Sequence, residues 1–105
     1  MSTTPTTAGA TCAGLPATLV GTNGDDELIG TDGPDVIVGG DGADLIRGLG
    51  GNDTICGGDG KDELYGGDGD DYINGGNGKD ALYGGPGVDD LVGGNGKDEI
   101  FPDGP

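Results

Sequence analysis

The stretch GGDGKDELY at residues 57–65 decides the fold, because close copies of it lie on both sides. The two nonapeptides before it read GGDGADLIR and GLGGNDTIC, and the two after it read GGDGDDYIN and GGNGKDALY. Further outward, the nine-residue period continues without insertion or deletion from Gly21 to Phe101, which makes nine copies. So regular a period does not arise by chance, and it predicts a repeat architecture over residues 21–101.

Four of the nine positions are constant. Positions one and four are Gly in every copy and position eight is always Leu or Ile. Position six is always Asp: Asp26, Asp35, Asp44, Asp53, Asp62, Asp71, Asp80, Asp89 and Asp98. Glycine allows positive φ and lets carbonyl groups approach a ligand, so we predict that positions one to six form a turn. Positions seven to nine are predicted to form a short strand whose position-eight side chain points inward while its neighbours point outward.

A turn followed by a strand reverses the chain once, so two nonapeptides make one coil of 18 residues. Successive coils then stack as parallel strands, with the odd copies in one sheet and the even copies in the other. The predicted fold class is all-β, a parallel β-roll (a β-helix or solenoid) with two facing parallel sheets and a thin aliphatic core. Three segments flank or precede the roll. We predict a flexible lead-in at residues 1–11, an N-terminal capping segment at 12–20 that ends in a strand, and a proline-bounded stop at 102–105.

The charge of the chain favours cations as partners. Asp and Glu number 20 against 4 Lys and Arg, there is no His, and the net charge is −16. Such a chain is not expected to bind nucleic acid, and its apolar runs are too short to insert into a membrane. The thin core cannot offset the entropy of ordering the repeats, and stacked Asp carboxylates repel one another. A hard divalent cation that bridges carboxylate and carbonyl oxygens would solve both problems, so we predict that folding is coupled to calcium.

The nonapeptide GGxGxDxUx resembles the calcium-binding repeat of the RTX (haemolysin-type) family across residues 21–101. This resemblance implies that each ion lies between two turns on the same edge of the roll, held by both position-six carboxylates and by main-chain carbonyls. The implied pairs are Asp26–Asp44, Asp44–Asp62, Asp62–Asp80, Asp80–Asp98, Asp35–Asp53, Asp53–Asp71 and Asp71–Asp89, which allows up to about seven ions. Position-three side chains are either further ligands or simple turn formers: Asn23, Asp32, Asp41, Asp59, Asp68, Asn77 and Asn95.

Some copies depart from the family pattern. Position two is Thr22, Thr31 and Leu49 in copies one, two and four, and position three is Gly50 and Pro86 in copies four and eight. We therefore expect weaker sites around these four copies. The strongest sites are expected at the pairs Asp44–Asp62, Asp62–Asp80 and Asp80–Asp98.

Three further groups of side chains each allow two interpretations. A row of Lys61, Lys79 and Lys97 is either a set of solvated charges that offset nearby carboxylates or a basic docking strip. Position nine of the odd sheet carries Tyr65, Tyr83 and Phe101, which predict an outward aromatic ladder used for cross-strand packing or for contact with a protein or carbohydrate. Cys12 and Cys56 favour a disulfide over two free thiols, provided that the lead-in folds back along the even sheet.

No constellation for catalysis is present. The chain has no His and its only Ser is Ser2, so we predict that it is not an enzyme. We expect a monomeric, secreted structural or stabilising module that folds on binding calcium after export. The alternatives are a surface adhesion or interaction module, and the calcium-binding fragment of a larger secreted enzyme. A lanthanide would suit the same oxygen ligands as calcium.

Overall fold

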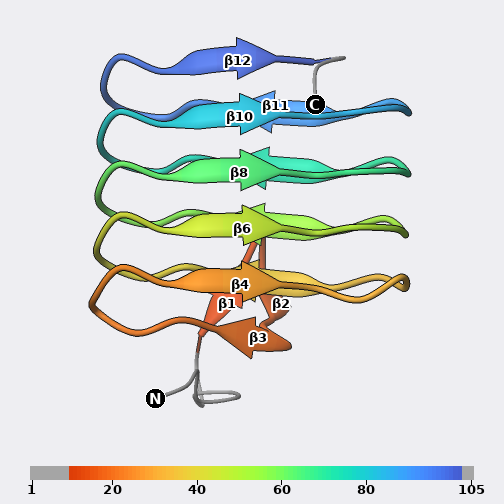
Figure 1. Ribbon diagram of the computed structural model, residues 1–105, viewed down its shortest axis with the longest axis horizontal. Helices are drawn as coiled ribbons and strands as arrows, with labels where there is room; N and C mark the ends of the chain where they lie inside the picture. Colours follow the sequence, from red (N-terminus) through yellow and green to blue (C-terminus); the bar gives the residue numbers. More distant parts are fainter. Residues whose placement is uncertain (1–9, 103–105) are drawn as a thin grey trace.

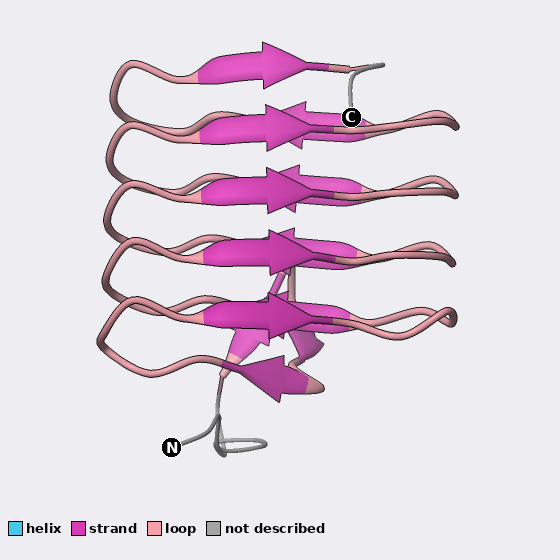
Figure 2. Cartoon of the chain, in the orientation of Figure 1, coloured by secondary structure: helices cyan, strands magenta, loops and turns pink. Residues whose placement is uncertain are grey.

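The computed structural model describes residues 10–102, which contain only β-strands as regular secondary structure (Figures 1 and 2). The first strands are β1 (Thr11–Cys12), β2 (Leu15–Pro16) and β3 (Leu19–Val20). Those of the repeats are β4 (Glu27–Ile29), β5 (Val36–Val38), β6 (Leu45–Arg47), β7 (Thr54–Cys56), β8 (Glu63–Tyr65), β9 (Tyr72–Asn74), β10 (Ala81–Tyr83), β11 (Asp90–Val92) and β12 (Glu99–Phe101). Each of these last nine strands occupies positions seven to nine of a nonapeptide, as predicted.

The strands form two parallel sheets that face each other. The sheet built from the odd-numbered nonapeptides, which we call the odd sheet, has the strand order β12-β10-β8-β6-β4. The sheet built from the even-numbered nonapeptides, which we call the even sheet, has the order β11-β9-β7-β5 and ends with β3 of the N-terminal segment. Partners lie one coil of 18 residues apart in the sequence, for example Leu82 beside Leu64. Figure 1 shows the strands stacked one above another with turns at both sides. The predicted all-β parallel β-roll is therefore confirmed. Within residues 10–102 there is also no helix that is long and apolar enough to span a bilayer.

Position-eight side chains fill the space between the sheets. Seven of them are at most 1% exposed: Leu28, Ile37, Ile46, Ile55, Leu64, Ile73 and Leu82. The prediction of an inward, buried position eight fails at the C-terminal end, where Leu91 is only partly buried and Ile100 is 43% exposed. The reason is geometric, because among the described strands β12 pairs with β10 alone and the facing sheet already ends at β11.

The N-terminal segment covers the other end of the roll. Strands β1 and β2 form an antiparallel hairpin, and β3 continues the even sheet by pairing with β5. Strand β1 packs against β5 and β7, and the favoured disulfide Cys12–Cys56 joins it to β7 with a Cα–Cα distance of 5.7 Å. Thr11, the last residue of the predicted lead-in of residues 1–11, belongs to β1. The rest of that lead-in, and residues 103–105 of the predicted stop, lie outside the described residues apart from Ala10.

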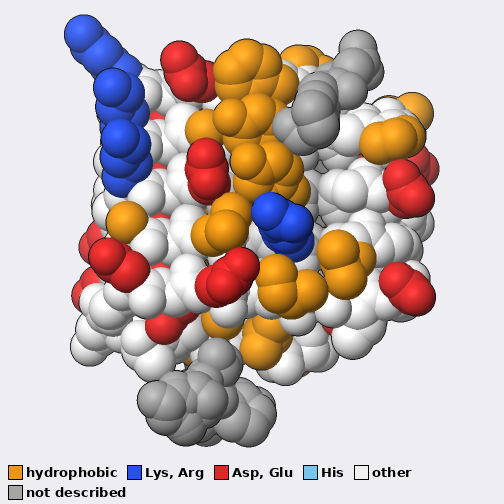
Figure 3. All heavy atoms as spheres, in the orientation of Figure 1, with side chains coloured by type: hydrophobic (Ala, Val, Ile, Leu, Met, Phe, Trp, Pro, Cys, Tyr) orange, Lys and Arg blue, Asp and Glu red, His pale blue; other side chains and the backbone are white. Residues whose placement is uncertain are grey.

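The outward face of the odd sheet carries the predicted aromatic ladder. The rings of Tyr65 and Tyr83 stack at 4.5 Å between centroids, and those of Tyr83 and Phe101 at 4.9 Å. The guanidinium of Arg47 lies 5.6 Å from the centre of the Tyr65 ring. Figure 3 shows hydrophobic side chains gathered in a stripe across the strands of this sheet, with lysine side chains in a column along one edge.

Candidate metal centre

Turns of copies three to nine share one backbone conformation, which we call the open turn. Positions two and four both have positive φ in each of them, for example 90° at Gly58 and 106° at Gly60. Open turns also stack very closely, because a Cβ added to Gly60 would lie only 2.3 Å from the carbonyl oxygen of Gly42 one coil earlier. Glycine is required at position four for both reasons, as the sequence predicts, and the stacking aligns the carbonyl groups of successive turns.

Glycine at position one has a different role from the predicted one. None of the position-one glycines has positive φ. A Cβ on Gly57 would instead lie 2.6 Å from Oδ2 of Asp62 in its own turn and 2.8 Å from the carbonyl oxygen of Gly75 in the next coil. The prediction that this glycine supplies a left-handed conformation was therefore wrong. Position one is Gly because the position-six carboxylate occupies the space that a side chain would need.

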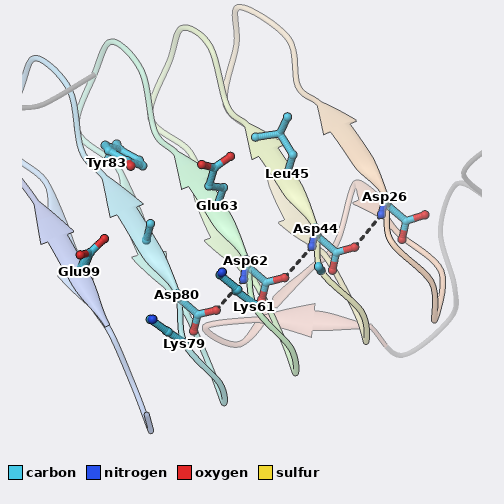
Figure 4. Close-up of a pocket in the computed structure, with 12 residues that line it drawn as sticks. Asp26, Asp44, Leu45, Lys61, Asp62, Glu63, Lys79, Asp80, Tyr83 and Glu99 are labelled. Carbon is cyan, nitrogen blue, oxygen red and sulfur yellow. Dashed lines mark hydrogen bonds between the residues drawn. The ribbon is translucent and has the colours of Figure 1, made fainter. Parts of the chain in front are cut away.

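Position-six aspartates form one ladder along each edge of the roll. The backbone N–H of each aspartate from Asp26 to Asp80 donates to Oδ1 of the aspartate one coil later, as in Asp44 to Asp62 at 2.9 Å and Asp53 to Asp71 at 2.8 Å. Figure 4 shows this ladder from Asp26 through Asp44 and Asp62 to Asp80. Seven such hydrogen bonds exist, and they join the same pairs that the family resemblance implies as calcium sites.

The second oxygen of most of these carboxylates is buried without a donor. This holds for Oδ2 of Asp44, Asp53, Asp62, Asp71 and Asp80. All five side chains are at most 3% exposed. A buried carboxylate is costly unless a donor or a cation compensates its charge. Within residues 10–102, these five buried oxygens are therefore the groups that most need a compensating donor or cation.

Burial also makes these carboxylates hard to ionise. Loss of solvation raises the pKa of Asp62 from 3.8 to about 8, and those of Asp44, Asp53 and Asp71 to about 7. The hydrogen bond from the backbone N–H of the aspartate one coil earlier lowers each pKa in part, whereas the negative charges of neighbouring aspartates raise it further. The pKa of Asp80 is raised by burial as well. At neutral pH, the ladder needs either protons or a cation.

The donor set fits a hard cation. It consists of carboxylate oxygens with carbonyl oxygens of the glycine-rich turns nearby, and it includes no imidazole or thiolate. Ca²⁺ prefers such oxygen ligands and accepts six to eight of them in a flexible arrangement. Within residues 10–102, no three acidic or Cys side chains converge on one point. Each site would therefore take two ladder carboxylates and complete its shell with main-chain carbonyls.

The turns of copies one and two differ from all the others, and we call them closed turns. In the first, Thr22 donates its N–H to Oδ2 of Asp26 at 2.7 Å and its hydroxyl to Oδ1 at 2.9 Å. In the second, Thr31 makes the same contacts with Asp35 at 2.7 and 3.0 Å. Both oxygens of these two carboxylates thus have protein donors. The sequence indicates an altered turn at both threonines, but it does not reveal that the hydroxyl binds the aspartate.

Position-three side chains lie exposed at the tips of the turns. On the odd edge, the Nδ2 group of Asn77 donates to Asp59 at 3.0 Å and that of Asn95 donates to Asn77 at 2.9 Å. This contact between coils is compatible with the turn-forming role, and ligation by Asn23, Asp32, Asp41, Asp59, Asp68, Asn77 and Asn95 stays a prediction.

A ladder at position five was not predicted. There, Asn52 accepts the N–H of Asp70 at 2.8 Å, and Asp70 accepts that of Val88 at 2.8 Å. Asp25 accepts the N–H of Ala43 in the same way. The signal that could have revealed this ladder is the 18-residue spacing of Asn52 and Asp70, which places both on the same edge.

A parallel β-roll with a ladder of buried carboxylates on each edge is a metal-binding repeat module. The model of the RTX calcium-binding nonapeptide repeat matches the chain in four copies, at residues 20–55, 57–91 and 83–101. The chain belongs to this family and is a calcium-binding β-roll module. No curated protein and no solved structure matches it significantly. The family model counts four copies, whereas the sequence pattern divides residues 21–101 into nine nonapeptides.

Proposed function

We propose that this chain folds when it binds calcium and then serves as a secreted structural or stabilising module. The observation that carries the proposal is the set of five buried Oδ2 atoms without donors, at Asp44, Asp53, Asp62, Asp71 and Asp80. Seven fully buried aliphatic side chains are too few to pay for five buried negative charges as well as the ordering of the chain. Binding free energy and folding free energy are then largely the same quantity.

In this proposal, the rise in calcium concentration on export from the cell causes the chain to fold. Calcium is scarce in the cytoplasm and abundant outside the cell, so the chain would stay unfolded until it leaves. The Cys12–Cys56 disulfide supports an oxidising destination, because such bonds persist outside the cytoplasm. A module of this kind could also be part of a larger secreted protein whose catalytic site lies elsewhere.

The test is a calcium titration followed by far-ultraviolet circular dichroism, with the disulfide intact and with magnesium as the control. We expect a weak β signal in excess chelator and a cooperative gain with calcium. Magnesium should produce little change, because it demands octahedral geometry and gives up its water reluctantly. A chain that shows its full β signal in chelator would sink the proposal.

A second candidate function, contact with a partner protein, is favoured by Leu49. This residue has a φ of 72° and is 40% exposed, although a left-handed conformation is unfavourable for a leucine. It borders a groove together with Arg47, Tyr65, Tyr83 and Pro86. The flat faces of the tyrosines are turned towards each other, so they are not free to stack on a sugar.

The candidate surface can be tested by titrating the calcium-loaded protein with apolar proline-rich peptides and, separately, with neutral oligosaccharides. We expect the ring signals of Tyr65 and Tyr83 to shift in nuclear magnetic resonance spectra with the peptides only. The shifts should disappear in Leu49→Gly. Unchanged ring signals with both ligand classes would remove this second candidate.

A further inference from the structure

In each closed turn a threonine hydroxyl donates to the position-six aspartate, so no carboxylate oxygen is left without a donor. We propose that Thr22 and Thr31 substitute for calcium in the first two turns, and that the first coil is a calcium-independent cap on which the other turns assemble. This inference rests on the proposed function, because it assumes that the open turns bind calcium.

Hydrogen bonding completes each closed turn without a cation. The hydroxyl of Thr22 accepts the N–H of Gly24 at 3.1 Å while it donates to Asp26 at 2.9 Å. The hydroxyl of Thr31 accepts the N–H of Gly33 at 3.2 Å while it donates to Asp35 at 3.0 Å. The threonine hydroxyl therefore fixes the turn. Together with the threonine N–H, it provides hydrogen bonds to the carboxylate that a bound cation would otherwise have to replace.

The backbone follows this difference. Position four has positive φ in every open turn, but it has none in the closed turns, at Gly24 and Gly33. Position two differs in the same way, because Thr22 and Thr31 have no positive φ whereas Gly40, Leu49 and the later residues at this position do. The two kinds of turn are thus separate conformations of one repeat.

The N-terminal segment fastens this first coil independently of the ladder. The hydroxyl of Thr18 donates to the carbonyl of Val36 at 3.1 Å and accepts its N–H at 3.0 Å, which ties β3 to β5. Strand β1 packs against β5 of the first coil, and the disulfide from Cys12 to Cys56 joins it to β7 of the second coil. None of these contacts requires a charge to be neutralised. The cap can therefore form where the open turns cannot.

The proposal predicts how many ions bind. Seven aspartate pairs exist, and the pairs Asp26–Asp44 and Asp35–Asp53 each include a closed turn. Five pairs join open turns only: Asp44–Asp62, Asp62–Asp80, Asp80–Asp98, Asp53–Asp71 and Asp71–Asp89. We expect the native chain to bind five calcium ions at these pairs.

The decisive variant is Thr22→Gly/Thr31→Gly, which restores the open-turn residue at both positions. It should bind about seven ions by equilibrium dialysis, against five for the native chain, because each carboxylate loses its hydroxyl donor and glycine allows the positive φ of the open turn. The matched variant Thr22→Val/Thr31→Val removes the hydroxyls but gives no open turn, and it should gain no ion. Thr54 lies in β7 outside the turns, so Thr54→Val serves as a control that should bind five ions like the native chain.

Hydrogen exchange in excess chelator tests the cap itself. With the disulfide intact, the amides of Thr22, Gly24, Thr31 and Gly33 should exchange at least about tenfold more slowly than those of Asp62 and Asp71. This protection should be lost in the valine variant and after reduction of the disulfide.

The outcomes separate this inference from the function beneath it. A native chain that binds seven ions, or closed-turn amides that gain protection only when calcium is added, would overturn the cap while leaving calcium-coupled folding intact. A chain that binds no calcium and does not change its fold would overturn the proposed function instead.

Discussion

The first two turns and the seven that follow share one period, one pair of sheets and one constant aspartate, yet they satisfy that aspartate differently. In the closed turns, Thr22 and Thr31 donate to it. In the open turns, glycine or Leu49 takes their place, and five carboxylates keep a buried oxygen without a donor. The difference teaches that the constant aspartate can be satisfied in two ways. The residue at position two decides whether protein donors reach both carboxylate oxygens or leave one of them buried without a donor.

The largest effect that separates the two regions is expected from removing an aspartate. Asp62 lies in the middle of an open-turn ladder, and Asp26 lies in a closed turn at its start. Asp62→Ala should lower the free energy of unfolding in saturating calcium by about 4 kcal/mol, because it affects two sites and leaves a backbone N–H without its acceptor. Asp26→Ala should cost about 1 kcal/mol. Equal losses in urea unfolding would contradict shared ligation along the ladder.

Alanine at position four should distinguish the two turn conformations almost as strongly. Gly60→Ala places a Cβ 2.3 Å from the carbonyl oxygen of Gly42 at a φ of 106°, and should cost about 3 kcal/mol. Gly24→Ala meets nothing nearer than 3.7 Å at a φ that is not positive, and should change stability by less than about 0.5 kcal/mol. Thermal melts in saturating calcium would measure both. A similar loss for both alanines would mean that the turns do not differ.

Acid should partly replace calcium in the open turns. The pKa of Asp62 is raised to about 8 and those of Asp44, Asp53 and Asp71 to about 7, so the folded chain holds these protons more tightly than the unfolded chain. The resulting stability of the calcium-free roll is complete below pH 3.8 and is lost as the pH rises through about 7 to 8.

In chelator, lowering the pH from 8 to 5.5 should therefore favour the folded state by at least about 1.4 kcal/mol, which corresponds to one pKa unit at one site. Circular dichroism would record the gain in β signal, and the calcium needed for half-saturation should rise over the same range. A β signal that falls on acidification would contradict the direction of these pKa changes.

The smallest effect concerns the one open turn that is built without glycine at position two. Leu49 has a φ of 72°, whereas Gly58 and Gly67 hold the same position in their turns with φ of 90° and 84°. Leu49→Gly should stabilise the calcium-loaded roll by about 1 kcal/mol, because the strain of a left-handed leucine disappears. A loss of stability in thermal melts would mean that the exposed leucine packs more favourably than its backbone indicates.

The sequence predicted the architecture because the period places the same chemistry at the same point of every coil. The inward position eight, the two parallel sheets and the aspartate pairs all follow from the 18-residue coil. It failed at Ile100, because a periodic pattern does not show which strand has a neighbour on only one side. The reason for Gly57 and the other position-one glycines was also missed. Sequence alone does not tell a glycine that adopts positive φ from one that leaves room for a carboxylate.

The sequence predicted which aspartates lie side by side, but not the hydrogen bonds that join them. That Asp44 and Asp62 pair is a matter of spacing, whereas the donation from a backbone N–H to Oδ1 depends on the depth at which the side chain lies. The threonines were recognised as departures from the family pattern. Their effect depends on whether the hydroxyl reaches Asp26 and Asp35, which only the turn geometry reveals.

The central claim is that the buried negative charge that opposes folding is also what binds calcium. The most direct measurement is the β signal in excess chelator of Asp44→Asn/Asp62→Asn/Asp80→Asn, which keeps an oxygen acceptor on each rung but removes three charges. We predict that this variant is more folded than the native chain without calcium, and that it binds fewer ions when calcium is present. A variant that is no more folded in chelator and binds as many ions as the native chain would contradict the claim.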